Sequence, residues 1–400
     1  MSEQLQQSSQ KGVNVGIVFT MCLLVLFANG FSLFKTIPIM TTMMTAFQVD
    51  TGMMGVLNSA YNWASLILMI PIGYFVRQTR PRVAVGVGGI VTIIGHLIPL
   101  MAQTSFLALT VGRMVEGVGS NCLIMVAASL ITTLFMGRKG MSTAISTTIA
   151  APMVAQFVHL NIAGRVVPAY GWQGVYVYIT VFQAVSVVLF ILFCGSKITI
   201  AGTTQAETNS AKNTAHIYKN SNLWLISIAL ALFTIATVSF GTYVPVYFQD
   251  LGMTEAQANG MYSISTVLGL VAMLVSGIIA DRCKGVRKVA IISFLGGVLA
   301  FILLMILPVN LMIIYILVYG TIPRAVNPMS QAAIPSVVKD KLDVPVAKSL
   351  METVGRIFNL FSAIVVGFLI QLGGWPLSMT VLAICMAVGA ILWILARRIP

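Results

Sequence analysis

The feature that most limits the fold of this chain is a series of apolar runs, each about 20 residues long. A run of that length crosses the hydrocarbon core of a bilayer as one helix. Composition agrees, because 8% of the residues are charged, against roughly 25% in a soluble protein. The sequence predicts twelve spans, at 14–40, 52–76, 83–102, 105–134, 141–163, 173–195, 222–248, 257–280, 288–307, 310–336, 345–371 and 376–396.

The longest polar segment, 197–220, divides the chain into near-equal halves and has the Thr/Ala/Asn-rich composition of a linker. We therefore expect an N-terminal six-helix bundle at 1–195, a linker at 196–221 and a C-terminal bundle at 222–400. A duplicated six-helix unit is typical of transporters. The halves share three motifs in register: Gly73 with Gly277, Gly171-Trp172 with Gly374-Trp375, and Phe34–Pro38 with Phe240–Pro245.

Lysine and arginine mark the orientation of the chain. If the N-terminus is cytoplasmic, the inner side receives eighteen of the 23 Lys and Arg residues, and the outer loops receive only Arg165. Cytoplasmic loops carry the excess of positive charge in membrane proteins. We expect a multi-pass protein of the cell (inner) membrane with both termini, and the linker, in the cytoplasm.

Charge and cysteine patterns exclude other partners. The net charge of +13 is spread in short groups between apolar runs, not in the basic stripes with aromatic partners that bind nucleic acid. The five cysteines lie far apart without metal-ligand spacing. The sequence predicts no nucleic-acid partner, no metal site and no cofactor.

Two motifs resemble signatures of the major facilitator superfamily. The loop Gly277-x-x-x-Asp281-Arg282-x-Lys284-Gly285-x-Arg287-Lys288 resembles its G-x-x-x-D-R-x-G-R-R motif. In span four, Arg113-x-x-Glu116-Gly117-x-Gly119 resembles its R-x-x-x-G-x-G motif. The resemblance implies an all-α integral membrane fold of two pseudo-symmetric six-helix bundles, usually monomeric. The bundles rock around a central cavity that spans one, four, seven and ten line.

The loop motif also implies a conformational latch on the cytoplasmic side. Its first-half copy keeps Gly73, Arg77, Arg80 and Arg82 but has Val76 where the family has an aspartate. The missing acid predicts a weaker or differently made latch in the first half. The latch residues are Gly73, Arg77, Gly277, Asp281 and Arg282.

Ionisable side chains inside hydrocarbon are costly, so each one suggests a function. Four are positive and two negative, which leaves a surplus of positive charge for an anionic substrate to offset. The six within the predicted spans are Lys35, Arg113, Glu116, Arg324, Glu352 and Arg356.

The expected substrate contacts are cationic. Arg324 stands between Pro323 and Pro328, where broken helix hydrogen bonds are tolerated only if the backbone faces protein or a wet cavity. Its guanidinium can bind a carboxylate through two parallel hydrogen bonds, or it can be a structural arginine bonded to freed carbonyls. Lys35 can line the cavity or snorkel to the outer interface. Arg356 and the aromatic Tyr243 complete the predicted substrate site.

Coupling to an ion is expected on spans four and eleven. Arg113 and Glu116 share one helix face, and the resemblance associates this arginine with proton coupling; a structural ion pair is the alternative. Glu352 and Arg356 also share a face and can neutralise one another, or Glu352 can take part in coupling.

These features predict a secondary active transporter for a small anion, a carboxylate or similar ion, with a proton or counter-anion as the coupled species. The alternative is proton-coupled efflux of drugs or other amphipathic compounds, which requires Glu116 as its carboxylate. The sequence Ala151-Pro152 keeps the proline but lacks the glycines of the antiporter motif, which weighs against that alternative. A transporter-like sensor is a further alternative, but such proteins usually carry a soluble domain, which the sequence does not predict. An enzyme is not expected, because no set of catalytic residues stands on neighbouring helix turns.

Overall fold

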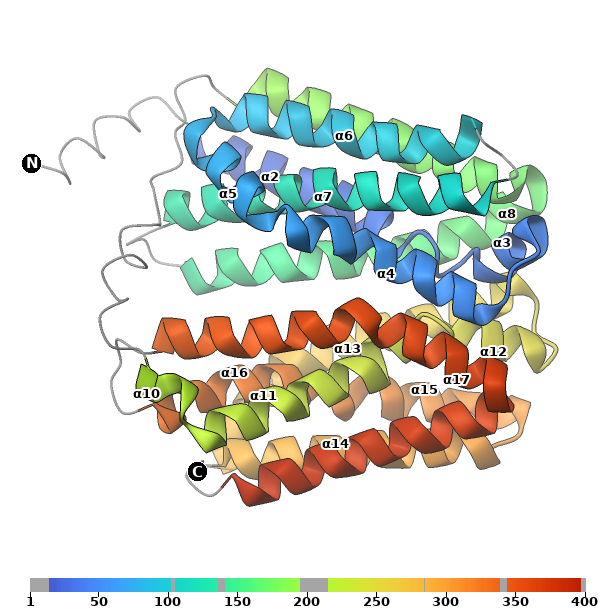
Figure 1. Ribbon diagram of the computed structural model, residues 1–400, viewed down its shortest axis with the longest axis vertical. Helices are drawn as coiled ribbons and strands as arrows, with labels where there is room; N and C mark the ends of the chain where they lie inside the picture. Colours follow the sequence, from blue (N-terminus) through green and yellow to red (C-terminus); the bar gives the residue numbers. More distant parts are fainter. Residues whose placement is uncertain are drawn as a thin grey trace, which may run out of the picture. The chain divides into compact units, whose positions relative to one another are not determined.

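The computed structural model describes residues 14–101, 105–135, 141–194, 215–283, 285–338 and 344–396. These residues form helices joined by turns (Figure 1). By their internal contacts they group into two compact units, Met1–Gln48 with Ala60–Gly202, and Val49–Ser59 with Thr203–Pro400. The boundary between the units therefore crosses one helix, near its middle.

The first unit holds the helices from α2 to α8, of which α4 belongs to it from Ala60 onward (Figure 1). Within it α6 packs on α7, while α2 packs on both α7 and α8. Gly171 has a φ of 62° and separates α8 into two spans. The helices are α2 (Val15–Phe34), α3 (Met40–Phe47), α4 (Thr51–Ile67), α5 (Met69–Gln78), α6 (Pro81–Met101), α7 (Phe106–Phe135) and α8 (Met141–Phe193).

The second unit repeats this plan. Within it α11 and α14 pack on α17, and α13 packs on α15. Gly374, with a φ of 67°, divides α17. The elements are α10 (Ala215–Tyr218), α11 (Ser221–Phe233), the π-helix η1 (Thr234–Ser239), α12 (Val244–Asp250), α13 (Glu255–Cys283), α14 (Val286–Ile306), η2 (Val309–Leu311), α15 (Met312–Thr321), η3 (Pro323–Ala325), α16 (Val326–Val337) and α17 (Val344–Leu395).

Nine stretches in the described part of the chain are long and apolar enough to cross a membrane. Two of them, in α8 and α17, are pairs of spans joined at glycine kinks. Another span is α4 with α5, which a break at Leu68 divides into two shorter helices. The described residues thus form twelve transmembrane helices, in two pseudo-symmetric six-helix bundles. The predicted linker falls mostly on residues outside the described part, and α11 begins at Ser221, where Asn220 caps its first turn.

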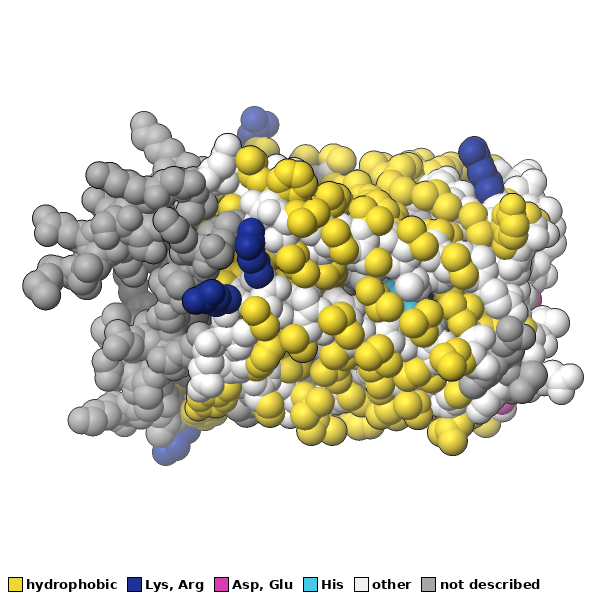
Figure 2. Space-filling model, turned by 90° about the horizontal axis from the view of Figure 1, so that it is seen from above, with side chains coloured by type: hydrophobic (Ala, Val, Ile, Leu, Met, Phe, Trp, Pro, Cys, Tyr) yellow, Lys and Arg dark blue, Asp and Glu magenta, His cyan; other side chains and the backbone are white. Residues whose placement is uncertain are grey.

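The outer surface of the helices is apolar. Large side chains such as Ile90, Ile94 and Val181 are exposed on it. Figure 2 shows hydrophobic side chains over the middle of one face, with the visible lysines and arginines toward its ends. Such a band is the surface that a bilayer covers.

The first span of each half is broken. The sequence predicts a span reaching residue 40, but α2 ends at Phe34 because Pro38 has no N–H to donate to the Phe34 carbonyl. The chain instead forms a turn with Ile37 N 3.1 Å from Phe34 O. In the second half, Pro245 likewise has no N–H for the Gly241 carbonyl, and a turn precedes α12.

Candidate functional site

The break in α2 exposes backbone carbonyls inside the bundle, and Arg113 of α7 satisfies them. Its Nη1 donates to the Ser32 carbonyl at 2.6 Å and its Nη2 to the Leu33 carbonyl at 2.8 Å. The last carbonyls of a helix have no partner within it, and hydrocarbon offers no water in exchange. Arg113 therefore holds the broken end of α2 against α7.

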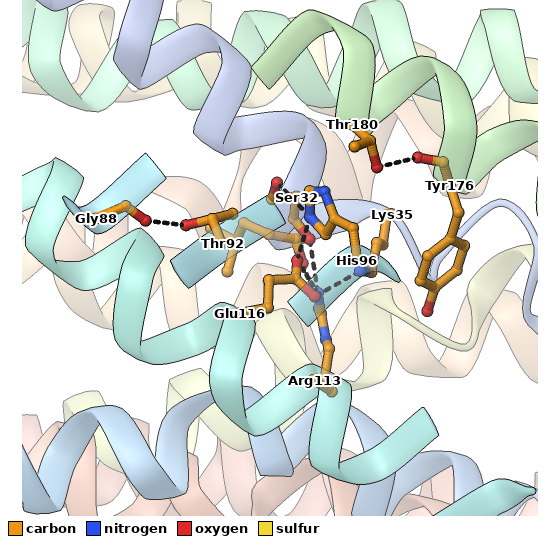
Figure 3. A network of polar contacts seen from close by, with 10 residues as sticks. Ser32, Lys35, Gly88, Thr92, His96, Arg113, Glu116, Tyr176 and Thr180 are labelled. Carbon is orange, nitrogen blue, oxygen red and sulfur yellow. Dashed lines mark hydrogen bonds and ion pairs between the residues drawn. The ribbon is translucent and has the colours of Figure 1, made fainter. Parts of the chain in front are cut away.

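Glu116 lies one turn further along α7, at the centre of a buried charge cluster (Figure 3). Its Oε1 is 2.9 Å from Nη1 of Arg113, and its Oε2 is 2.5 Å from Nζ of Lys35. His96 of α6 approaches Oε1 at 3.4 Å. The Glu116 side chain has no exposed surface and that of Lys35 has 1%. Lys35 therefore does not snorkel to the interface.

Aromatic rings and a close helix contact surround this cluster. The Lys35 ammonium lies 4.1 Å from the ring centre of Tyr176, and the Arg113 guanidinium lies 4.6 Å from that of Tyr61, distances at which a cation is attracted to a π face. Gly95 permits α6 to reach α7, because a Cβ there would lie 2.5 Å from the Glu116 nitrogen. That approach brings His96 to the carboxylate.

His96 adds a polar group that sequence reasoning missed. Its Nε2 is 3.1 Å from the Ser32 hydroxyl, and its buried Nδ1 has no hydrogen-bond partner. An imidazole with its proton on Nε2 leaves no buried N–H unpaired and adds no third positive charge. The cluster of Lys35, Arg113 and Glu116 then carries one net positive charge.

The equivalent break in the second half is held by a neutral group. The Tyr319 hydroxyl of α15 donates to the Thr237 carbonyl at 2.5 Å. The hydroxyls of Tyr319 and Tyr262 both face Gly241, where a Cβ would come within 2.9 and 2.5 Å of them. The turn after η1 is therefore packed by tyrosines.

Arg324 lies in η3, between α15 and α16. Its guanidinium is 5.1 Å from the ring centre of Tyr319, and its buried Nε has no hydrogen-bond partner. Within the described ranges, no acidic side chain forms an ion pair with it. Gly269 of α13 lies against the side chain, since a Cβ there would be 3.2 Å from Nε.

The remaining predicted substrate and coupling residues lie apart from these two sites. The buried Tyr243 hydroxyl donates to the carbonyls of Ala363, at 2.8 Å, and Thr51, at 3.2 Å. Arg356 is exposed on α17. Glu352 lies 3.9 Å from the ammonium of Lys348, and both of these side chains are about half exposed.

The predicted latch stays a prediction. The side chains of Arg77 and Asp281 fall outside what the structure describes, while Arg282 is exposed at the end of α13. Gly73 and Gly277 have room for a Cβ, with a nearest atom at 3.6 Å for Gly73 and none within 4 Å for Gly277.

Two other arginines of the same loop motifs cap helix ends. Arg82 donates to the carbonyls of Cys194 and Leu192 at the end of α8. Arg287 donates to those of Trp393 and Ile394 at the end of α17. Each motif thus ties the start of the third span in its half to the end of the sixth.

Comparisons with known proteins agree with this architecture. The sequence model described as Major Facilitator Superfamily matches residues 22–320 and 248–400. The fold is similar to that of the nucleoside transporter NupG, with a TM-score of 0.78, 13% identity, and coverage of 97% of this chain and 100% of that one. It is also similar to a bacterial homologue of the human lysosomal transporter Spinster, solved inward-facing and unoccupied, with a TM-score of 0.72, 12% identity and 96% of each chain covered. Likeness at such identities shows the fold alone. No curated protein matches the sequence.

Proposed function

The chain belongs to the major facilitator superfamily and is a secondary transporter that works by alternating access, and we propose that its substrate is a small anion, a carboxylate or similar ion, contacted by Arg324. This membership makes it a transporter and not an enzyme. The observation that carries the proposal is the half-buried Arg324 in the second unit, whose guanidinium forms no ion pair and whose Nε has no hydrogen-bond partner among the described residues.

Charge is the reason to expect an anion at this position. Arg324 is half-buried, and its buried Nε has no hydrogen-bond partner among the described residues. A cation within a membrane bundle is costly when it is not compensated, and the Tyr319 ring offsets only part of that cost. A carboxylate can accept two parallel hydrogen bonds from the N–H groups of a guanidinium, with both groups in one plane. The Tyr315 ring stacks on Tyr319 at 5.2 Å and has a buried hydroxyl without a partner. Arg324 and Tyr315 thus each offer a polar group to a ligand.

The alternative, proton-coupled efflux of amphipathic compounds, requires Glu116 to face a cationic or apolar substrate. In the structure both carboxylate oxygens of Glu116 already contact cations, Lys35 and Arg113. Protonating Glu116 would leave two positive charges buried together. The arrangement therefore supports anion transport over that alternative.

Uptake into proteoliposomes tests the proposal. We expect uptake of at least one of radiolabelled formate, oxalate or benzoate, and a fall of about tenfold or more in Arg324→Gln and Arg324→Lys. Arg165→Gln is the matched control, because Arg165 is an exposed arginine of α8 that lies outside the proposed substrate site. Normal anion uptake by both Arg324 variants would contradict the proposal. Dye efflux that depends on Glu116 would instead support the alternative.

We also propose that the protein lies in the cell membrane with both termini cytoplasmic, on the distribution of lysine and arginine. Reporter fusions at residue 400 and in the loop after α12 test this orientation. The reverse pattern of reporter activity would contradict it.

A further inference from the structure

The charge cluster of the first unit has a neutral counterpart in the second. Phe34 and Phe240 mark equivalent points of the repeat, 206 residues apart, and the same separation relates Arg113 to Tyr319. It also relates Lys35 to Gly241 and Glu116 to Ile322.

A glycine of the third span lies against each set. A Cβ on Gly95 would meet the backbone of Glu116, and a Cβ on Gly296 would meet the side chain of Ile322. His96 follows Gly95, and in the second half Gly297 follows Gly296. The repeat therefore builds the same break and the same helix approach with apolar or neutral residues.

The charges of the first unit are consequently not required by the fold. Buried ion pairs are often no more stable than apolar side chains of similar volume, and the second unit is built without them at these positions. Their presence in the first unit indicates a function that needs charge.

The cluster of Lys35, Arg113 and Glu116 carries a net charge of +1, and each possible proton exchange changes this buried charge in a different direction. Arg113 stays protonated in proteins. Protonation of Glu116 would raise the net charge of the buried cluster to two. Loss of a proton from Lys35 would lower it to zero and leave the Arg113–Glu116 pair, at 2.9 Å, intact.

The groups that face Lys35 come from three helices. Glu116 and Arg113 lie on α7, and His96 lies on α6. From α8, the Tyr176 ring lies 4.1 Å from Nζ, and His159 lies close enough to interact electrostatically. Glu116 is the one acid among them, and its second oxygen is committed to Arg113.

We propose that transport by this protein is coupled to a proton and that Lys35 is the site at which this proton binds and is released. On release the Nζ–H bond breaks, the electron pair stays on Nζ, and the proton passes to water on the side to which the site is open. Glu116 stays ionised throughout and holds Arg113 against the end of α2. The inference rests on the transport activity of the family and on the buried charge cluster, not on the identity of the anion.

Nuclear magnetic resonance of the full chain in detergent micelles tests the inference directly. Lysine labelled with ¹⁵N at Nζ and glutamate labelled with ¹³C at Cδ report both groups between about pH 5 and pH 10. We expect the Lys35 signal to change from ammonium to amine while the Glu116 signal stays that of a carboxylate. Lys35→Arg and Lys35→Gln assign the lysine signal by its loss, and Lys348→Arg, with its side chain 55% exposed, is the matched control.

Two outcomes overturn the inference. One is a Glu116 signal that converts to the carboxylic acid while Lys35 stays an ammonium, which would place the proton on Glu116. The other is a Lys35 signal that stays an ammonium over the whole range.

Proteoliposomes with an imposed proton gradient give a second measurement. Wild type and Lys348→Arg should show anion uptake stimulated by the gradient, and any uptake in Lys35→Arg should lose that stimulation. Stimulation retained in Lys35→Arg would contradict the inference. If wild type takes up none of the anions tested, the proposed substrate class is wrong, and the resonance experiment still decides the role of Lys35.

Discussion

Arg113 and Tyr319 occupy equivalent positions in the two halves, and each donates to backbone carbonyls beside the break in the first span of its half. Arg113 reaches the carbonyls of Ser32 and Leu33, at 2.6 and 2.8 Å, and Tyr319 reaches that of Thr237 at 2.5 Å. The carbonyls of Ser32 and Leu33 lie in the last turn of α2 and need a partner within the membrane, whereas that of Thr237 also accepts the Phe240 N–H. In each half, a side chain of the fourth span thus contacts the broken first span, through a charged group in one half and a neutral group in the other.

This difference predicts unequal costs of substitution. Tyr319→Phe removes one neutral hydrogen bond and should lower stability by about 1 kcal/mol. Arg113→Met removes two bonds to carbonyls and one partner of a buried carboxylate, so we expect a loss of about 3–5 kcal/mol. Thermal unfolding in detergent measures both, with Tyr74→Phe, at an exposed tyrosine, as the control. Equal losses in the two variants would contradict a charged role for Arg113.

A second prediction concerns the order of stability among variants of the charge cluster. Glu116→Gln leaves Lys35 and Arg113 buried without an acid and should cost about 3–5 kcal/mol. Lys35→Gln leaves a neutral Arg113–Glu116 pair and should cost less. The double variant restores the original net charge and should be more stable than Glu116→Gln alone. Unfolding temperatures at neutral pH give the comparison, and strictly additive losses would contradict the coupling.

Hydrophobic run length was enough to predict the twelve spans, because the bilayer sets the length of each helix. The glycine motifs Gly171-Trp172 and Gly374-Trp375 correctly marked the starts of spans six and twelve, since both glycines have positive φ. The end of α2 at Phe34 was missed, because the apolar run continues past the break.

The site was predictable only along one helix. Arg113 and Glu116 stand three residues apart, so their shared face follows from helix geometry. The partners of Glu116 on other helices, Lys35 and His96, depend on how the helices pack, which spacing does not encode. Gly95 was the available signal for His96, because a glycine inside an apolar span indicates a close helix approach.

Close helix contact at Gly95 gives a third prediction. A Cβ there would lie 2.5 Å from the nitrogen and 2.7 Å from the Cα of Glu116, and backbone atoms cannot give way as a flexible side chain can. Gly95→Ala should therefore push α6 from α7 and cost about 1–3 kcal/mol. Gly277→Ala is the control, since nothing lies within 4 Å of its Cβ position. Unfolding temperature measures both, and a loss in Gly277→Ala equal to that in Gly95→Ala would contradict the packing argument.

The paired helix caps give a fourth prediction. Arg82 and Arg287 each donate to carbonyls in the last turn of the sixth span of their half, where the helix dipole also favours a cation. Arg82→Gln and Arg287→Gln should each cost about 1 kcal/mol, and the loss should be local. Amide hydrogen exchange should accelerate at 190–194 in the first variant and at 391–395 in the second. Arg80→Gln, at an exposed arginine two positions before Arg82, should leave both segments unchanged. Acceleration in both segments from a single substitution would show that these arginines act on the whole fold and not on one helix end.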